Sequence, residues 1–417
     1  MQHIIIGAGP AGVVAAETLR KCDPEAAITL IGDEPEPPYS RMAIPYYLID
    51  NVGEAGTYLR GAGEHFATQN IEVVQQRVDR IDAAAKTVIL ADGASRSYDK
   101  LLIATGSHPV SPPIPGLDLP QVHSCWTLED ARHIIELAQS GSNVVLIGAG
   151  FIGCIILEAL VKRGVNLTVV ETGNRMVPRM LDDKAGSLLE TWCKDQGIDV
   201  HTSCSVQAVA AGEDNQVQVS LSDGSALTAA LVITATGVKA NIDLLDGTGI
   251  ETDFGVLVNQ RMQSSDPHVY AAGDVAQGVD FSTGQQEVQA IQPTATDHGR
   301  IAALNMAGQG DQHQGTLNMN VLDTLGLISC SFGLWMGVDG GDSSELYNPD
   351  EFQYINLQFD GNLLVGASAV GKTQHVGVLR GLIESKTDLR HWKDRLMKDP
   401  TLVMDAYIGS TQELGYR

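Results

Sequence analysis

Two copies of a strand–turn–helix unit constrain this chain more than any other feature. In the first copy, the apolar residues 3–6 lead directly into a glycine-rich turn at residues 7–12, and a helical pattern follows. In the second copy, residues 144–147 lead into a matching turn at residues 148–153, followed by a helix that ends before Gly164. The two turns begin 141 residues apart, which indicates a duplicated βαβ unit and not a short-period repeat.

Both turns have the Gly-x-Gly-x-x-Gly pattern that binds dinucleotides. The first glycine allows a tight turn, the second lets a pyrophosphate approach the backbone, and the third lets the helix pack closely on the strand. The N–H groups at the start of the helix attract phosphate. Acidic residues that accept hydrogen bonds from ribose end the second strand of each unit, namely Asp33 and Glu34 in the first and Glu171 in the second. A single such turn is a common βα connection, but two complete units predict electron transfer between two dinucleotides.

Glu171 favours NADH over NADPH at the second unit. Its carboxylate would place a negative charge against the 2′-phosphate of NADPH, whereas it can accept hydrogen bonds from the free ribose of NADH. No arginine follows Glu171 directly, and Arg175 lies four positions further along the chain. NADPH is therefore the less favoured nucleotide.

Composition excludes several other classes of protein. The chain has 417 residues and a formal net charge of −24, which opposes binding to nucleic acid and to anionic membrane surfaces. Its longest nearly apolar run, residues 144–161, is interrupted by three glycines and Glu158, so we expect no membrane span. The six cysteines have no metal-ligand spacing, and we expect reduced thiols in a cytoplasmic protein without a metal site.

Three further strands complete a recognisable set of motifs. Residues 101–106 and 231–237 each close on Ala-Thr-Gly, and residues 269–274 close on Gly-Asp. With the two glycine turns, this order of motifs covers residues 2–310. It resembles the FAD-dependent pyridine-nucleotide oxidoreductases, which have the glutathione-reductase-like fold with two dinucleotide domains. The resemblance implies FAD at the first unit and NADH at the second.

The resemblance also implies which residues contact each cofactor. For FAD they are Gly7, Gly9, Pro10, Ala11, Gly12, Asp33, Glu34, Arg41, Ala104, Thr105, Gly106, Gly273, Asp274, Pro293, Thr294 and Ala295. For NADH they are Gly148, Gly150, Phe151, Ile152, Gly153, Glu171 and Gly237. Asp274 is expected beside the ribityl or pyrophosphate part of FAD. A helix starting near Thr294 is expected to face the pyrimidine edge of the flavin, where reduction adds negative charge.

The expected fold is α/β, with two Rossmann-like domains and a C-terminal α+β domain. The FAD-binding domain would be discontinuous, formed by residues 1–110 and 241–315, and the NAD-binding domain would be residues 111–240. Five prolines between residues 107 and 120 suit a crossing between domains. Residues 316–417 alternate strands with helical stretches near 374–385 and 388–398, and form the expected cap or interface domain.

The segment Pro-Tyr-Ser-Arg at residues 38–41 is similar to ferredoxin and rubredoxin reductases and to the FAD part of NADH-dependent nitrite reductases. In those proteins an arginine at the Arg41 position contacts FAD. Relatives that act on disulfides or peroxide carry a cysteine where this chain has Met42, and a thioether forms no thiolate. Pro45-Tyr46 replaces the usual Ser-Lys, and Ile155 replaces a frequent glutamate, where the nicotinamide would stack on the flavin.

The leading interpretation is an NADH-dependent flavoprotein. It would pass a hydride from NADH to FAD, and then electrons to a ferredoxin- or rubredoxin-like protein or to a partner enzyme subunit. Residues 372–398 carry seven basic and three acidic side chains. This segment is a candidate docking surface for a small acidic carrier, although a solvated helix face explains it equally well. Direct reduction of oxygen, a quinone or a metal ion stays open, as do a redox-responsive nucleotide-binding subunit and either a monomer or a homodimer.

Overall fold

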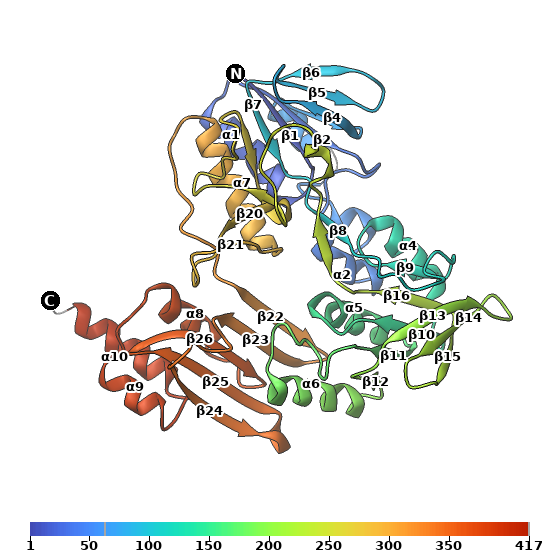
Figure 1. The fold of residues 1–417 in the computed structure, drawn as a ribbon, viewed down its shortest axis with the longest axis vertical. Coiled ribbons are helices and arrows are strands. Elements are labelled where there is room, and N and C mark those ends of the chain that lie inside the picture. Colours follow the sequence, from blue (N-terminus) through green and yellow to red (C-terminus); the bar gives the residue numbers. More distant parts are fainter. Residues whose placement is uncertain (62–63, 416–417) are drawn as a thin grey trace. The chain divides into compact units, whose positions relative to one another are not determined.

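The computed structural model describes residues 1–61 and 64–415, which divide into two compact units (Figure 1). Unit 1 contains residues 1–110, 126–128 and 238–316. Unit 2 contains residues 111–125, 129–237 and the chain from residue 317 onward. Each unit is built on a parallel sheet, as the duplicated βαβ pattern predicts.

Unit 1 has a parallel five-stranded sheet in the order β19-β7-β1-β2-β3. Its strands are β1 (Gln2–Ile6), β2 (Ala27–Gly32), β3 (Ile71–Gln75), β7 (Lys100–Ile103) and β19 (Val269–Ala271). Ile4, Leu30 and Leu102 are completely buried, because central strands of parallel sheets are covered on both faces.

Helices α1 (Pro10–Cys22) and α7 (Gln292–Met306) cross at close range in unit 1. A Cβ atom at Gly299 of α7 would lie 2.3 Å from the carbonyl oxygen of Ala11 in α1, so the crossing requires glycine there. The core of the unit continues into an antiparallel sheet of β4 (Val78–Asp82), β5 (Thr87–Leu90) and β6 (Ser95–Ser97).

Smaller elements complete unit 1. Its short helices are α2 (Ile44–Leu48), α3 (Glu64–Thr68) and the 3-10 turns η1 (Arg41–Ala43), η2 (Glu54–Thr57), η3 (Asp243–Leu245) and η4 (Gly273–Val275). Its remaining strands are β8 (Ser107–Pro109), β17 (Val238–Ala240), β18 (Val256–Leu257), β20 (Ala276–Val279) and β21 (Gln286–Val288).

Unit 2 repeats the parallel design in the order β12-β11-β10-β16-β9. Its strands are β9 (Val122–Ser124), β10 (Asn143–Ile147), β11 (Asn166–Val170), β12 (Asp199–His201) and β16 (Leu231–Thr234). Its helices are α4 (Leu128–Leu137), α5 (Phe151–Lys162) and α6 (Asp183–Asp195). An antiparallel sheet of β13 (Val206–Ala211), β14 (Val217–Leu221) and β15 (Ala226–Ala229) shares a core with the parallel one. Gly164, with a φ of 77°, follows α5 and confirms the predicted helix stop.

The C-terminal residues of unit 2 form an antiparallel sheet in the order β22-β23-β26-β25-β24. Its strands are β22 (Met319–Thr324), β23 (Leu327–Gly333), β24 (Asp342–Asn348), β25 (Gln353–Asp360) and β26 (Leu363–Val370), with a 3-10 turn η5 (Pro349–Glu351). Three helices follow, α8 (Val376–Glu384), α9 (His391–Leu396) and α10 (Val403–Gly415). The helical stretch predicted near residues 388–398 is present as the shorter α9, which begins only at His391 because Arg390 has a φ of 47° and cannot belong to the helix.

The predicted α/β fold class is confirmed. The division into three domains stays a prediction, although the C-terminal sheet and the second βαβ sheet lie in one compact unit. Within the described residues, no helix is both long enough and apolar enough to cross a membrane. The six cysteines are unpaired, and four of them, including Cys330 in β23, are buried.

Candidate dinucleotide sites

The predicted site residues of each unit follow the carboxyl ends of neighbouring parallel strands. In unit 1 most of them directly follow β1, β2, β7 and β19, which are adjacent in the sheet. In unit 2 the glycine turn follows β10, Glu171 follows β11, and Gly237 lies three residues beyond the end of β16. Parallel strands end at a common edge, so each set is brought together where open α/β sheets bind their ligands.

The three glycines of the first turn have different environments. A Cβ atom at Gly7 would lie 1.9 Å from the carbonyl oxygen of Ala104, and one at Gly12 would lie 1.9 Å from the carbonyl oxygen of Gly7. A Cβ atom at Gly9 would meet no atom within 4 Å. Packing therefore requires the first and third glycines, whereas the second borders open space that a pyrophosphate can enter.

The second turn has the same arrangement. A Cβ atom added at Gly148 would lie 2.5 Å from the carbonyl oxygen of Ala235. A Cβ atom added at Gly153 would lie 2.2 Å from the carbonyl oxygen of Gly148. At Gly150 it would meet nothing within 4 Å. The helices that start at these turns, α1 and α5, have no side-chain cap. Their first N–H groups are thus open to phosphate, and both turns fit a dinucleotide.

Arg41 holds the loop that follows β2. Its guanidinium donates hydrogen bonds to Glu34 Oε1 at 2.6 Å, to the Tyr39 hydroxyl at 2.7 Å and to the Trp126 carbonyl at 2.6 Å. It also lies over the rings of Tyr39 and Trp126, 5.4 and 5.3 Å from their centroids. The Tyr39 hydroxyl donates to the other oxygen of Glu34. Arg41 therefore fixes the orientation of Glu34, a predicted FAD ligand.

Asp274 is joined to the same cluster through Ser107. The Ser107 hydroxyl donates to Asp274 Oδ2 at 2.8 Å, and the indole N–H of Trp126 donates to the Ser107 carbonyl at 3.1 Å. Burial raises the pKa of Asp274 above its usual value, although Ser107 and the Arg41 charge oppose that shift. Ligand hydroxyls that donate to this carboxylate would stabilise its charged form.

The start of α7 lies next to the first turn. A Cβ atom at Gly273 would be 3.2 Å from the Cβ of Ala11 and 3.5 Å from the Cβ of Ala295. The Ser40 hydroxyl donates to Gln292 Oε1 at 3.1 Å, which ties the loop before Arg41 to the same helix start. The structure thus brings together predicted FAD residues from four segments of the chain.

Sequence reasoning missed four residues that shape this site, namely Tyr39, Ser107, Trp126 and Asn241. Asn241 donates to the Thr105 carbonyl at 2.7 Å, and its own carbonyl accepts from the Thr105 hydroxyl at 2.9 Å. Tyr39 lies within the Pro-Tyr-Ser-Arg segment and Ser107 directly follows the first Ala-Thr-Gly motif, so both could have been included. Trp126 and Asn241 are distant in sequence, and no pattern marks them. Met42 and Tyr46, which follow Arg41 in the chain, have side chains that are about half exposed.

Glu171 lies against the second glycine turn and is buried. Its Oε2 accepts the N–H of Ala149 at 2.7 Å, and its Oε1 accepts the N–H of Gly173 at 2.7 Å. The Thr172 hydroxyl also donates to Oε1, at 3.2 Å. A carboxylate held beside the turn in this way can still accept ribose hydroxyls, because each oxygen has further acceptor capacity.

Arg175 is hydrogen-bonded to its own loop and to the first residue of α6. It donates to the carbonyls of Leu181 and Pro178 at 2.8 and 3.2 Å, and to Asp183 and Asn174 at 2.7 and 2.8 Å. A guanidinium held this way is not available to neutralise a 2′-phosphate. The structure therefore supports the preference for NADH that Glu171 predicts.

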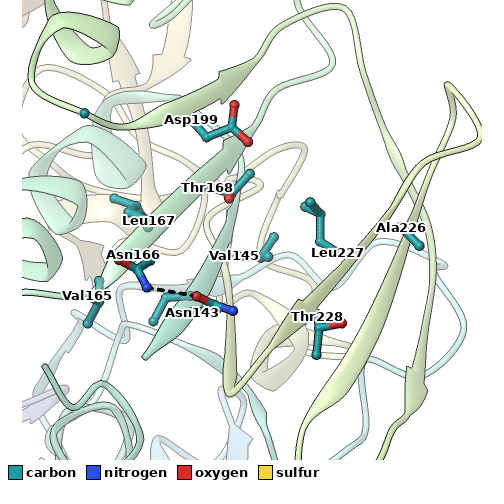
Figure 2. Close-up of a pocket in the computed structure, with 12 residues that line it drawn as sticks. Asn143, Val145, Val165, Asn166, Leu167, Thr168, Asp199, Ala226, Leu227 and Thr228 are labelled. Carbon is teal, nitrogen blue, oxygen red and sulfur yellow. Dashed lines mark hydrogen bonds between the residues drawn. The ribbon is translucent and has the colours of Figure 1, made fainter. Parts of the chain in front are cut away.

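One cavity of unit 2 lies away from the glycine turn. It has a volume of about 410 Å³ and is lined by Asn143, Asn166, Asp199 and Thr228, among others (Figure 2). Asn143 and Asn166 are the first residues of β10 and β11 and are hydrogen-bonded at 3.0 Å. This cavity is at the amino ends of the strands, opposite the glycine turn, and is not the predicted nucleotide site.

Many basic side chains of residues 372–398 are paired. Lys393 bonds to Asp342 at 2.6 Å, Arg380 bonds to Glu384 at 2.9 Å, and Arg395 lies over the Trp392 ring at 4.6 Å. The carboxylates of Asp342 and Glu384 reduce the positive field of the segment. In the part of the chain that the structure describes, no group of three or more His, Cys, Asp or Glu residues is arranged to hold a metal ion.

A model of the pyridine nucleotide-disulphide oxidoreductase family matches residues 1–299. The chain belongs to this family. It is an FAD-dependent NAD(P)H oxidoreductase, and its cofactors are FAD and NAD(H). The resemblance inferred from the motifs is thus confirmed, whereas the individual contact residues stay predictions.

Three relatives bear on the acceptor. The chain is 32% identical to the NADH-dependent phenylglyoxylate dehydrogenase subunit epsilon of Aromatoleum evansii, over 98% of both chains. It is also 32% identical to an NADH oxidase of Methanocaldococcus jannaschii, over 77% of this chain and 73% of that one. The crystal structure of a ferredoxin reductase from Rhodopseudomonas palustris is 28% identical, with a TM-score of 0.82, and the match covers 90% of this chain and 92% of that one.

Proposed function

We propose that this chain oxidises NADH and delivers the electrons to a protein acceptor, either an iron–sulfur carrier or a partner enzyme subunit. The observation that carries the proposal is the full-length similarity to an NADH-dependent dehydrogenase subunit. The similarity to a ferredoxin reductase supports an acceptor of the iron–sulfur type. Methionine at position 42 supports it further, because a thioether cannot act in a thiol-dependent reaction.

The residues of unit 2 bind and orient NADH. The open backbone at Gly150 and the uncapped start of α5 accept the pyrophosphate, and Glu171 accepts the hydroxyls of the adenosine ribose. Arg175 stays bonded within its loop. Binding energy from this half of the nucleotide holds it in place while the nicotinamide reacts.

The residues of unit 1 bind FAD and set its electrostatic surroundings. Gly9 and the start of α1 receive the pyrophosphate, and the carboxylates of Glu34 and Asp274 accept hydroxyls. Arg41 holds Glu34 in place, and the uncapped start of α7 offers partial positive charge. Bound FAD supplies the chemistry that accepts a hydride and releases electrons to the acceptor. The protein itself needs no acid–base pair for this reaction.

Residues 372–398 are the proposed docking segment for the acceptor. Ion pairs with Glu384 and Asp342 offset part of the positive charge of this segment, so steering of an acidic carrier would be modest and sensitive to salt. The cytoplasmic location stays a prediction based on the unpaired cysteines.

Direct reduction of oxygen is the second candidate, because an NADH oxidase is among the relatives. Stopped-flow reoxidation of the NADH-reduced holoenzyme separates the two functions. Anaerobic mixing with ferredoxins and rubredoxins is compared with mixing into oxygenated buffer. We expect at least one iron–sulfur protein to react faster than oxygen. If oxygen reacts fastest in the whole panel, the chain is an oxidase.

A further inference from the structure

We propose that Tyr354, on the C-terminal sheet, is a positioning residue for NADH. It would act through Asp182 on the loop between β11 and α6 that carries the predicted ribose contact. The inference rests on the proposed NADH site at Gly150 and Glu171, and all the residues involved lie in unit 2.

The loop at residues 171–181 is bonded to the glycine turn at two places. The Glu171 carboxylate accepts the N–H of Ala149 at 2.7 Å, and the N–H of Val177 donates to the Ala149 carbonyl at 2.8 Å. Val177 has a φ of 44° and is buried. A β-branched residue in this region of backbone space is strained, so surrounding contacts must hold the loop in this conformation.

Helix α6 provides much of that support. A Cβ atom at Gly186 would lie 2.8 Å from both Arg175 Cδ and the Met176 carbonyl oxygen, so the loop packs directly on the helix backbone. The Arg175 guanidinium bonds to Asp183 at the start of the helix. The position of the loop therefore depends on the position of the first turn of α6.

Asp182 and Tyr354 fix that first turn. Asp182 Oδ1 caps α6 by accepting the N–H of Ala185 at 3.0 Å. Its Oδ2 accepts the Tyr354 hydroxyl at 2.5 Å and the Asn356 amide at 3.3 Å. Tyr354 is 1% exposed, and burial, with the nearby carboxylates of Asp182 and Glu345, raises its pKa. The hydroxyl therefore stays protonated, and it lies closer to Asp182 Oδ2 than to its second acceptor, Glu345 Oε2, at 3.3 Å.

The C-terminal sheet contacts α6 at other points as well (Figure 1). Lys184 bonds to Glu345 at 2.5 Å, and the Trp192 indole donates to the Thr324 carbonyl at 3.0 Å. These contacts hold the helix against the sheet when the Tyr354 hydroxyl is removed. Tyr354→Phe should therefore alter the start of α6 without unfolding unit 2.

The test is the affinity of the holoenzyme for NAD⁺ and NADH in Tyr354→Phe and in Asp182→Ser. Serine keeps a capping oxygen for Ala185 but has no second oxygen for Tyr354. Losing a hydrogen bond to a charged group should raise the Kd for NAD⁺ and the KM for NADH about three- to tenfold in each variant. The kcat at saturating NADH, with ferricyanide as acceptor, and the FAD content should stay at wild-type values.

Tyr347→Phe is the matched control, because Tyr347 pairs with Tyr354 across the sheet but is 43% exposed. Tyr347→Phe should change neither the Kd for NAD⁺ nor the KM for NADH. The double variant, Tyr354→Phe with Asp182→Ser, should bind NADH no more weakly than either single variant, because both changes remove the same hydrogen bond. An unchanged Kd in Tyr354→Phe, with or without a lower Tm, would overturn the positioning role. Failure of the wild-type holoenzyme to bind NAD⁺ or NADH would instead overturn the proposed function.

Discussion

Replacing Gly150 with alanine separates the folding role of the second glycine turn from its role in binding. The added Cβ atom meets no protein atom within 4 Å, and Gly150 has a φ of −74°, which alanine adopts readily. Alanine is a poorer N-cap than glycine, so the loss of stability should be about 1 kcal/mol or less. The methyl group would occupy the space proposed for the pyrophosphate. Overpacking of this kind costs about 1–3 kcal/mol, which raises the KM for NADH roughly 5- to 150-fold.

The assay compares Gly150→Ala with two other glycine variants. Gly9→Ala, the equivalent change in unit 1, should lower FAD retention and leave the apoprotein folded. Gly148→Ala should destabilise unit 2 strongly, because its Cβ would lie 2.5 Å from the Ala235 carbonyl oxygen and its φ is 101°. Steady-state kinetics, FAD content and urea unfolding distinguish these results. A wild-type KM for NADH in folded, FAD-loaded Gly150→Ala would refute the proposed path of the pyrophosphate.

Three further changes test other parts of the account. Glu171→Gln should raise kcat/KM for NADPH relative to NADH about tenfold, because it removes a negative charge facing the 2′-phosphate; an unchanged ratio would show that Glu171 does not face the ribose. Met42→Ala should keep most of the wild-type ferricyanide turnover, since no thiol chemistry depends on this position, and loss of turnover would contradict that reading. Burial lowers the pKa of His298 from 6.5 to about 3. As the pH falls, His298 is therefore protonated in the unfolded chain before it is protonated in the folded chain. The unfolding free energy decreases as the pH drops from about 6.5 towards 3. Urea unfolding at neutral pH and near pH 5 should show a smaller difference in His298→Gln than in the wild type.

Short-range patterns predicted the parallel sheets and both glycine turns. The steric demands at Gly7, Gly12, Gly148 and Gly153 arise within a few residues of each strand end, and glycine is the residue that meets them. The acid at the end of β11 also lies where the periodicity placed it. These features depend on local sequence, so they could be read without the structure.

Contacts between distant segments could not be predicted in this way. Arg41 bonds to the Trp126 carbonyl, 85 residues away, and Tyr354 bonds to Asp182, 172 residues away. The sequence also overstated the free positive charge of residues 372–398, because Lys393 in α9 forms an ion pair with Asp342 of β24. Such contacts depend on tertiary packing, which no local pattern of residue types specifies.

Anaerobic titration of the purified holoenzyme with NADH tests the central claim most directly. The account predicts that a stoichiometric amount of NADH bleaches the visible absorption of the bound flavin. It also predicts that an iron–sulfur protein restores the absorption without oxygen. A flavin that keeps its absorption in excess NADH would contradict the assignment of the chain as an electron-transferring enzyme.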